Sequence, residues 1–341
     1  MSGAVVGAAT TGGRRLDVPR RELRPAEYPE LLDYRDAIRH SYWLHTEYNL
    51  TEDVHDFHAR VTEVERSAIK NAMLAISQVE VAVKTFWGDL HKRYPKPEIG
   101  AVGYTFAESE VRHQDAYAHL LDVLGLNGEF ARLDASPLRA RLDLLDAHLA
   151  RPRQAAGAEA GREAALELLL FSAFTEHVSL FSQFLIMKAF DRHKNLFKGV
   201  ANIVEATSKE EQLHGQFGYH LVRLLREENP GWFDADFDAR VASACRDAYA
   251  AETIVLDWIL EAGELDFLPR EVIDAFVMQR FDAALAAVGL APIFEPDPAL
   301  VARSLWFDEE VLAGKHYDFF HKRPTAYAKK TKPITSDDLF G

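Results

Sequence analysis

Apolar residues recur at helical spacing along most of this chain, from about Val61 onward. Pro and Gly cluster at a few places, near residues 94–97, 125–128, 154–161 and 229–231, and not at the short, regular intervals that separate strands. This pattern predicts an all-α fold. The long helices are expected near residues 61–91, 103–126, 137–150, 162–190, 195–226, 236–261 and 269–288.

The length and apolar content suit one large helical domain, because 48% of the 341 residues are apolar and can form a sizeable core. We expect residues 1–27, which are small, polar and basic, to form a loose N-terminal extension without a secretory signal. Residues 28–320 are then the helical domain. Residues 321–341 are expected to be a flexible tail.

Charge and cysteine content exclude several classes of protein. A formal net charge of -14 argues against binding nucleic acid or an anionic membrane, since both need concentrated Lys and Arg. The single cysteine, Cys245, excludes an internal disulfide and fits a reducing, cytoplasmic location. The most apolar stretch, Leu166 to Phe190, has Glu176 near its centre, which predicts a helix buried in protein and not in lipid.

Two segments read Glu-x-x-His, with Glu110 before His113 and Glu211 before His214. Residues three apart share one face of a helix, so each pair can converge on a cation. The motif alone is weak. With 14 histidines and 53 acidic residues, roughly two acidic-x-x-His matches are expected by chance. The chain has four, including Glu52 with His55 and Asp318 with His321, and these last two lack a buried helical context.

The positions of the Glu110–His113 and Glu211–His214 pairs in the chain distinguish them from chance matches. Glu80 precedes Glu110 by 30 residues and Glu176 precedes Glu211 by 35, so a Glu on one apolar helix is followed by Glu-x-x-His on the next, twice. A single Glu or His in such a helix is more often a satisfied core group. Four buried carboxylates without cations would be very costly, however.

The repeated arrangement is the ligand set of ferritin-like dimetal proteins. Four carboxylates and two imidazoles suit two divalent ions, iron or manganese. We therefore expect a ferritin-like helical bundle with additional helices. The predicted metal ligands are Glu80, Glu110, His113, Glu176, Glu211 and His214.

From about Arg39 to the end, the chain resembles the small subunit of class I ribonucleotide reductase. The resemblance is carried by the segment around Trp43 and Asp56-Phe57, the helix with Glu80, and the runs 107–113 and 209–214, in the family's order. It implies an oxidoreductase subunit whose metal pair, activated by dioxygen or superoxide, stores an oxidising equivalent. A large subunit would use that equivalent to reduce ribonucleotides to deoxyribonucleotides. The resemblance also implies a homodimer.

The resemblance implies roles for further residues. Tyr117 occupies the position of the radical tyrosine, Trp43 begins the radical path, and Glu210 stands where an acidic residue links that tryptophan to His113. Tyr327 is the candidate that passes the radical to the large subunit, although a solvated tail aromatic is an equally good interpretation. The alternative for Tyr117 is an ordinary core tyrosine whose hydroxyl is satisfied.

The C-terminus fits a docking tail of this family, with Leu339 and Phe340 as apolar anchors beside Asp337 and Asp338. Deleting such a tail should leave the metal site intact.

Two departures from the best-known members bear on the metal. Glu80 replaces an Asp found in many of them, and Lys84 lies one helical turn beyond it. Lys84 could hydrogen-bond a ligand carboxylate and alter the redox potential, or form an ordinary Glu–Lys pair. The combination looks like the dimanganese subclass, in which Tyr117 is a bystander. A di-iron centre with a tyrosyl radical and a mixed manganese–iron pair are the alternatives.

Other classes of function are compatible with such a bundle. A ferritin-like metal-storage cage is disfavoured by the length of the chain and by its tail. An oxidase built on the same bundle would require a hydrophobic ligand pocket at the metals. A metal-free helical scaffold would purify without metal.

Overall fold

The computed structural model describes residues 14–134, 137–139, 141–143 and 157–312, and these residues form helices and no named strand. The predicted all-α fold is confirmed. The α-helices are α1 (Leu32–His40), α2 (Thr51–His55), α3 (Glu63–Arg93), α4 (Pro97–Val123), α6 (Ala158–Leu170), α7 (Phe181–Lys194), α8 (Lys198–Glu228), α9 (Ala235–Ile259), α10 (Arg270–Ala287), α11 (Pro298–Ala302) and α12 (Leu305–Phe307). Three π-helices, η3 (Asp56–Arg60), η5 (Phe171–Ser179) and η7 (Asp308–Leu312), and short 3-10 helices complete the described chain.

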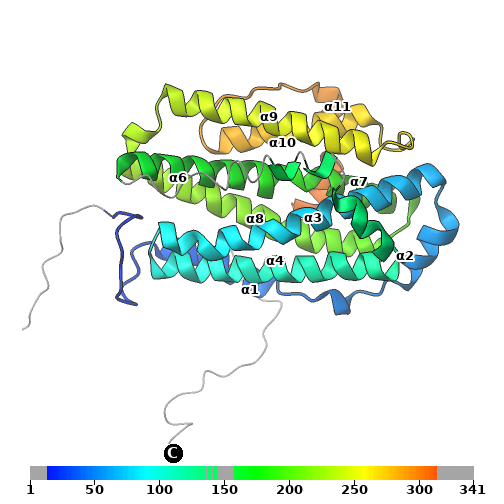
Figure 1. Cartoon of the computed structure of the whole chain (residues 1–341), viewed down its shortest axis with the longest axis horizontal. Coiled ribbons are helices and arrows are strands. Elements are labelled where there is room, and N and C mark those ends of the chain that lie inside the picture. Colours follow the sequence, from blue (N-terminus) through cyan, green and yellow to red (C-terminus); the bar gives the residue numbers. More distant parts are fainter. Residues whose placement is uncertain (1–13, 135–136, 140, 144–156, 313–341) are drawn as a thin grey trace, which may run out of the picture.

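The long helices run roughly along the longest axis of the molecule (Figure 1). Helices α3 and α4 form an antiparallel pair, and α8 packs against α4, α6 and α7. Helices α9 and α10 lie on the side of α6 and η5 that faces away from α3 and α4, and α1 packs against α4 and α8. One continuous hydrophobic core joins these elements, so the centre of the bundle is remote from solvent.

The starts of α3 and α4 follow local capping rules. Thr62 accepts the backbone N–H of Glu65, whose side chain accepts the N–H of Thr62, so a capping box begins α3. Helix α4 begins at Pro97, whose fixed φ suits the first helical turn. The sequence prediction that this helix begins near residue 103 was wrong, because a proline in the first turn starts a helix and does not break it.

The apolar stretch expected as one helix over 162–190 is interrupted. Helix α6 passes into the π-helix η5 and then, after a turn at Leu180, into α7. The segment Ala158–Lys194 is long and apolar enough to cross a membrane, but 89% of its most apolar window is buried in the protein. It is therefore a core segment, as its central glutamate suggested.

The N-terminus of α8 is held by two aspartates from the α2–η3 region. Asp53 accepts the backbone N–H groups of Gly199 and Val200 at 3.2 and 2.8 Å, and Asp56 accepts that of Phe197 at 2.9 Å. Phe197 has φ 59°, so the chain enters α8 through a left-handed residue. These bonds satisfy the free donors at the start of the helix that carries Glu211.

Within the predicted N-terminal extension, residues 1–27, the described part is residues 14–27, and it makes contacts with the helices. Leu16 is fully buried, and its backbone N–H donates to Glu228 at 2.8 Å. Arg20 forms an ion pair with the buried carboxylate of Glu98. Most of the helix expected over 137–150 and the tail expected over 321–341 lie outside the described residues.

Candidate metal centre

Three elements bring the described candidate ligands together. Helix α4 carries Glu110 and His113, the π-helix η5 carries Glu176, and α8 carries Glu211 and His214. All five side chains are buried to within about one per cent of their surface. The backbone of Glu80 belongs to α3 but its side chain is not described, so its place in the ligand set stays a prediction.

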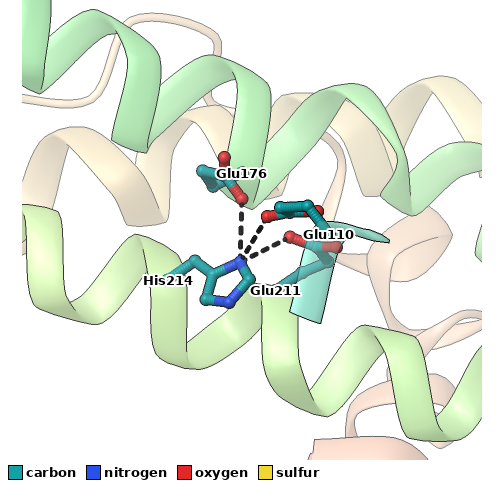
Figure 2. A group of neighbouring side chains, drawn as sticks. All are labelled: Glu110, Glu176, Glu211 and His214. Carbon is teal, nitrogen blue, oxygen red and sulfur yellow. Dashed lines mark hydrogen bonds and ion pairs between the residues drawn. The ribbon is translucent and has the colours of Figure 1, made fainter. Parts of the chain in front are cut away.

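Four of these residues converge at one point. Single ligand atoms of Glu110, Glu176, Glu211 and His214 all lie within 4.8 Å of one another. Figure 2 shows the three carboxylates pointing at the same imidazole nitrogen. His214 Nδ1 is 2.9 Å from Glu110 Oε1, 3.1 Å from Glu211 Oε2 and 3.3 Å from Glu176 Oε2.

His113 joins the cluster from the side of α4. Its Nδ1 lies 2.8 Å from Glu211 Oε1 and 3.2 Å from Glu110 Oε2. Glu110 and Glu211 therefore each face both histidines, one carboxylate oxygen towards each ring. The two rings are 6.2 Å apart between centroids. Two carboxylates shared by two imidazoles form a donor set of the kind that binds a pair of cations.

The pKa shifts within the cluster show that its buried glutamates favour nearby positive charge. Burial, with the charges of Glu211 and Glu110, raises the pKa of Glu176 well above its ordinary value. For His113 and His214, burial disfavours the proton, but the adjacent glutamates outweigh it and raise each pKa well above its ordinary value. Burial alone would raise the pKa of Glu211, but the two histidines lower it. Protons on the histidines thus offset the buried carboxylates, and divalent cations can replace them.

Other buried groups orient the candidate ligands. The indole N–H of Trp87 donates to Glu176 Oε1 at 3.0 Å. Ser109 Oγ lies 3.1 Å from His214 Nε2. Sequence reasoning missed both residues. Trp87 lies seven residues after Glu80, on the same face of α3, which is a weak signal, and nothing in the sequence marks Ser109. Partners outside the ligand set commonly fix the orientation of metal ligands.

The outer side of His113 meets the residues expected on the radical path. Glu210 Oε2 lies 2.8 Å from His113 Nε2, and the Trp43 ring stacks on the imidazole at 5.9 Å with an interplanar angle of 18°. Arg112 binds both oxygens of Glu210 at 3.2 Å and donates to the carbonyl of Trp43 at 3.3 Å.

The expected connection between Glu210 and Trp43 is thus made by Arg112, a residue to which the sequence analysis gave no role. Arg112 joins the carboxylate to the backbone of Trp43, while the indole N–H has no hydrogen-bond partner among the described residues. The signal available in the sequence was the position of Arg112 inside the Glu-x-x-His motif.

The remaining candidates are distributed around the centre. Tyr117 is buried on α4, one turn beyond His113. Lys84 donates to Gln114 Oε1 on α4 at 2.5 Å, so it reaches from α3 across to the helix of Glu110. Tyr327 lies outside the described residues, as do Asp318 and His321. Glu52 and His55 are exposed, in agreement with the interpretation that this pair is not a site.

The bundle and its buried cluster of glutamates and histidines define a ferritin-like protein with a carboxylate–histidine metal site. The family description "Ribonucleotide reductase, small chain" matches residues 20–299, and the chain belongs to that family. It is thus a small subunit of ribonucleoside-diphosphate reductase, an oxidoreductase, as the resemblance implied.

Individual relatives agree with this assignment. A probable ribonucleoside-diphosphate reductase small subunit of Invertebrate iridescent virus 3 is 26% identical over 348 residues, covering 95% of this chain and 88% of the viral protein. The ribonucleoside-diphosphate reductase subunit beta of Chlamydia pneumoniae is 24% identical, covering 84% of this chain and 83% of its own.

Solved structures share the fold. The R2 subunit of ribonucleotide reductase from Clostridium botulinum has a TM-score of 0.73 at 16% identity, with 85% of this chain and 90% of that chain covered. Streptococcus sanguinis dimanganese(II)-NrdF has a TM-score of 0.65 at 15% identity, covering 83% and 96%. An R2-like ligand-binding oxidase with a Mn/Fe cofactor has a TM-score of 0.66 at 15% identity, covering 78% and 95%.

Proposed function

We propose that this chain is the radical-generating subunit of a class I ribonucleotide reductase and that it holds two metal ions. The proposed ligands are Glu80, Glu110, His113, Glu176, Glu211 and His214. The observation that carries the proposal is the convergence of four of their ligand atoms within 4.8 Å in the buried core. When bound, the metals supply a one-electron oxidising equivalent after reaction with dioxygen or superoxide.

The chain's own residues give that equivalent a route outward. The Trp43 ring is stacked on His113 with 5.9 Å between the ring centroids, so the indole is close enough to lose an electron towards that proposed ligand. Glu210 faces His113 Nε2 and holds the proton there, which fixes the ring with Nδ1 towards Glu110 and Glu211. Arg112 in turn fixes Glu210 and the backbone of Trp43.

Two tyrosines have proposed roles of different kinds. Tyr117 lies in the core one turn from His113, where it is either a radical site or a bystander. Tyr327 is proposed to pass the oxidising equivalent to the large subunit. The C-terminal residues 321–341 would dock that subunit through Leu339 and Phe340. We also propose a homodimer in the cytoplasm.

For the metal we favour manganese at both positions. Lys84 reaches from α3 to Gln114 on α4, the residue directly after His113, and a neighbouring cation can change the redox potential of a metal pair. The S. sanguinis protein with the same fold holds dimanganese(II), whereas the oxidase holds Mn/Fe. Metal analysis with electron paramagnetic resonance (EPR) of the activated protein tests this choice. A tyrosyl signal from an iron-loaded, active enzyme would refute the manganese version.

The function is tested by mixing the full chain with its cognate large subunit and a ribonucleoside diphosphate. Glu110→Ala and Tyr327→Phe should each abolish formation of the deoxyribonucleotide. Glu63→Ala and Tyr104→Phe, at an exposed pair and an exposed ring, are matched controls that should retain it. Activity that survives both of the first two changes would refute the mechanism. Oxidation of a bound lipid without any large subunit would instead indicate an oxidase.

A further inference from the structure

A buried arginine outside the ligand set contacts the neighbours of two candidate ligands. Arg280, on α10, is 5% exposed. Its Nε donates to the backbone carbonyl of His177 at 2.7 Å, directly after Glu176 in the chain. Its Nη2 donates to Gln212 Oε1 at 3.4 Å, directly after Glu211. One guanidinium therefore contacts both the π-helix η5 and helix α8.

The contact of Arg280 with η5 supplies a hydrogen-bond donor to a backbone carbonyl near the end of that π-helix. The π-helix η5 ends at a turn at Leu180 before α7 begins, and carbonyl groups near a helix end lack intrahelical donors. Arg280 supplies a donor to His177, and the buried Arg141 supplies one to Ser179 at 3.3 Å. The end of the element that carries Glu176 is thus held by two guanidinium groups.

The surroundings of Arg280 keep it in one orientation. Its Cζ lies 3.5 Å from the centre of the Phe181 ring, and Nη1 is 3.3 Å from Asp308 in η7. Burial lowers the pKa of Arg280 to about 10, so the group is still charged at neutral pH. A planar fork with fixed donor directions sets distances between its acceptors, which a flexible ammonium group does not.

We propose that Arg280 is a positioning residue for the metal centre, setting the separation between η5 and α8 and hence the way Glu176 and Glu211 face each other. This proposal rests on the proposed function, because it assumes that these two carboxylates bind metal. It assigns no chemistry to Arg280 itself.

The test titrates the metal-free full-length protein with Mn(II), following free ions and the spin-coupled pair by EPR. Arg280→Gln and Arg280→Lys should weaken manganese binding by about tenfold and alter the coupled spectrum, as loss of a group that orients a ligand does elsewhere. Arg270→Gln is the matched control, because Arg270 starts the same helix and pairs with Asp257 and Asp274. A purely structural role would lower the melting temperature and leave the spectrum unchanged.

A folded Arg280→Gln protein with the wild-type affinity and spectrum would overturn the proposal. If that variant does not fold, the Gln212→Ala variant is used, because it removes only the contact of Arg280 with α8. A changed spectrum of the coupled pair in Gln212→Ala supports the proposal, and a wild-type spectrum overturns it. Wild-type protein that binds no manganese or iron would instead overturn the proposed function. In that case hydrogen exchange of the metal-free protein tests the positioning, with faster exchange over 171–179 expected in Arg280→Gln and not in Arg270→Gln.

Discussion

At Glu176, the hydrogen bond from Trp87 fixes one carboxylate oxygen and leaves the other facing His214. Glu176 Oε1 accepts the indole N–H at 3.0 Å, while Oε2 lies 3.3 Å from His214 Nδ1. A carboxylate held in this way has lost its rotational freedom before a cation arrives, so less entropy is lost on binding. The indole therefore contributes to metal affinity through orientation.

We expect Trp87→Phe to weaken metal binding by about tenfold, because the ring keeps its packing but loses the N–H donor. Trp258→Phe, at a buried tryptophan that faces Arg132, is the control for the smaller ring. Both changes should lower the free energy of unfolding by about 1–3 kcal/mol. Titration with Mn(II) and denaturant unfolding separate the two effects. Equal metal affinity in both variants would contradict the role given to the indole.

Cys245 provides a test of the core that is independent of metal. Burial, together with the charge of Asp282, raises the pKa of the Cys245 thiol to about 12. The thiolate is the reactive form, and it is negligible in the native protein at pH 8. We expect a thiol reagent to leave the native protein unmodified and to modify one thiol after unfolding in urea. The thiol of the unfolded chain ionises near pH 8.5, well below the pKa of the buried thiol. The contribution of Cys245 to the free energy of unfolding is therefore fully present below about pH 8.5 and decreases as the pH rises towards 12. Rapid modification of native protein would refute the burial.

Sequence reasoning located the candidate ligands but not the groups that orient them, and the reason is sequence separation. Glu110 with His113 and Glu211 with His214 are local pairs on one helical turn, so their shared face follows from the sequence. Trp87 meets Glu176 across 89 residues, and Arg280 meets His177 across 103. No periodicity encodes such contacts.

Among the elements, the contact of α8 with η5 is unusually close at one glycine. A Cβ added at Gly218 would lie 1.7 Å from Ser172 Oγ and 2.3 Å from Ser172 Cβ. Gly215, one turn earlier, would place a Cβ 3.4 Å from the Ser172 carbonyl and 3.5 Å from His177, which are ordinary contacts. The two glycines therefore form a matched pair on one helix face.

We expect Gly218→Ala to push η5 away from α8, lowering the free energy of unfolding by about 1–3 kcal/mol and weakening metal binding. Gly215→Ala should be neutral or stabilising, by up to about 1 kcal/mol, since alanine favours a helix more than glycine does. Denaturant unfolding and metal titration of the two variants give the comparison. Equal stability of both variants would show that the two elements are not in close contact at residue 218.

The π-helix itself could not be predicted from the sequence. Over the nine residues of η5, the change from i+4 to i+5 hydrogen bonds shifts the apolar period too little to be separated from an α-helix. The apolar character of the whole stretch was clear, so its burial was predicted while its interruption was not. The position of Glu176 relative to α8 depends on that interruption.

On the scale of the whole molecule, the repeated Glu and Glu-x-x-His pattern becomes a single site only when α4, η5 and α8 pack together. Glu110 and Glu211 come from the two halves of the pattern, and each lies close to both histidines. The order of the motifs predicted which residues meet. Their mutual geometry depends on helix packing, which the sequence pattern leaves open.

The described chain ends with α12 and η7, which belong to the core. Phe307 and Val311 are fully buried, and Asp308 pairs with Arg280. Residues 321–341 follow this anchored segment and lie outside the described residues. If the tail serves only to dock the large subunit, its removal should separate assembly from metal binding.

We expect protein ending at residue 320 to bind manganese as the full chain does and to unfold within about 0.5 kcal/mol of it, because Phe307 and Val311 remain in place. Reduction of a ribonucleoside diphosphate with the large subunit should be lost. A peptide of residues 321–341 should inhibit the full-length enzyme, while the same peptide with Leu339→Ala and Phe340→Ala should not. Protein ending at residue 304 is the contrasting control, since it lacks Phe307 and Val311 and should be strongly destabilised. Full activity of the protein ending at residue 320 would contradict docking through the tail, because this protein lacks residues 321–341 and keeps the core residues Phe307 and Val311.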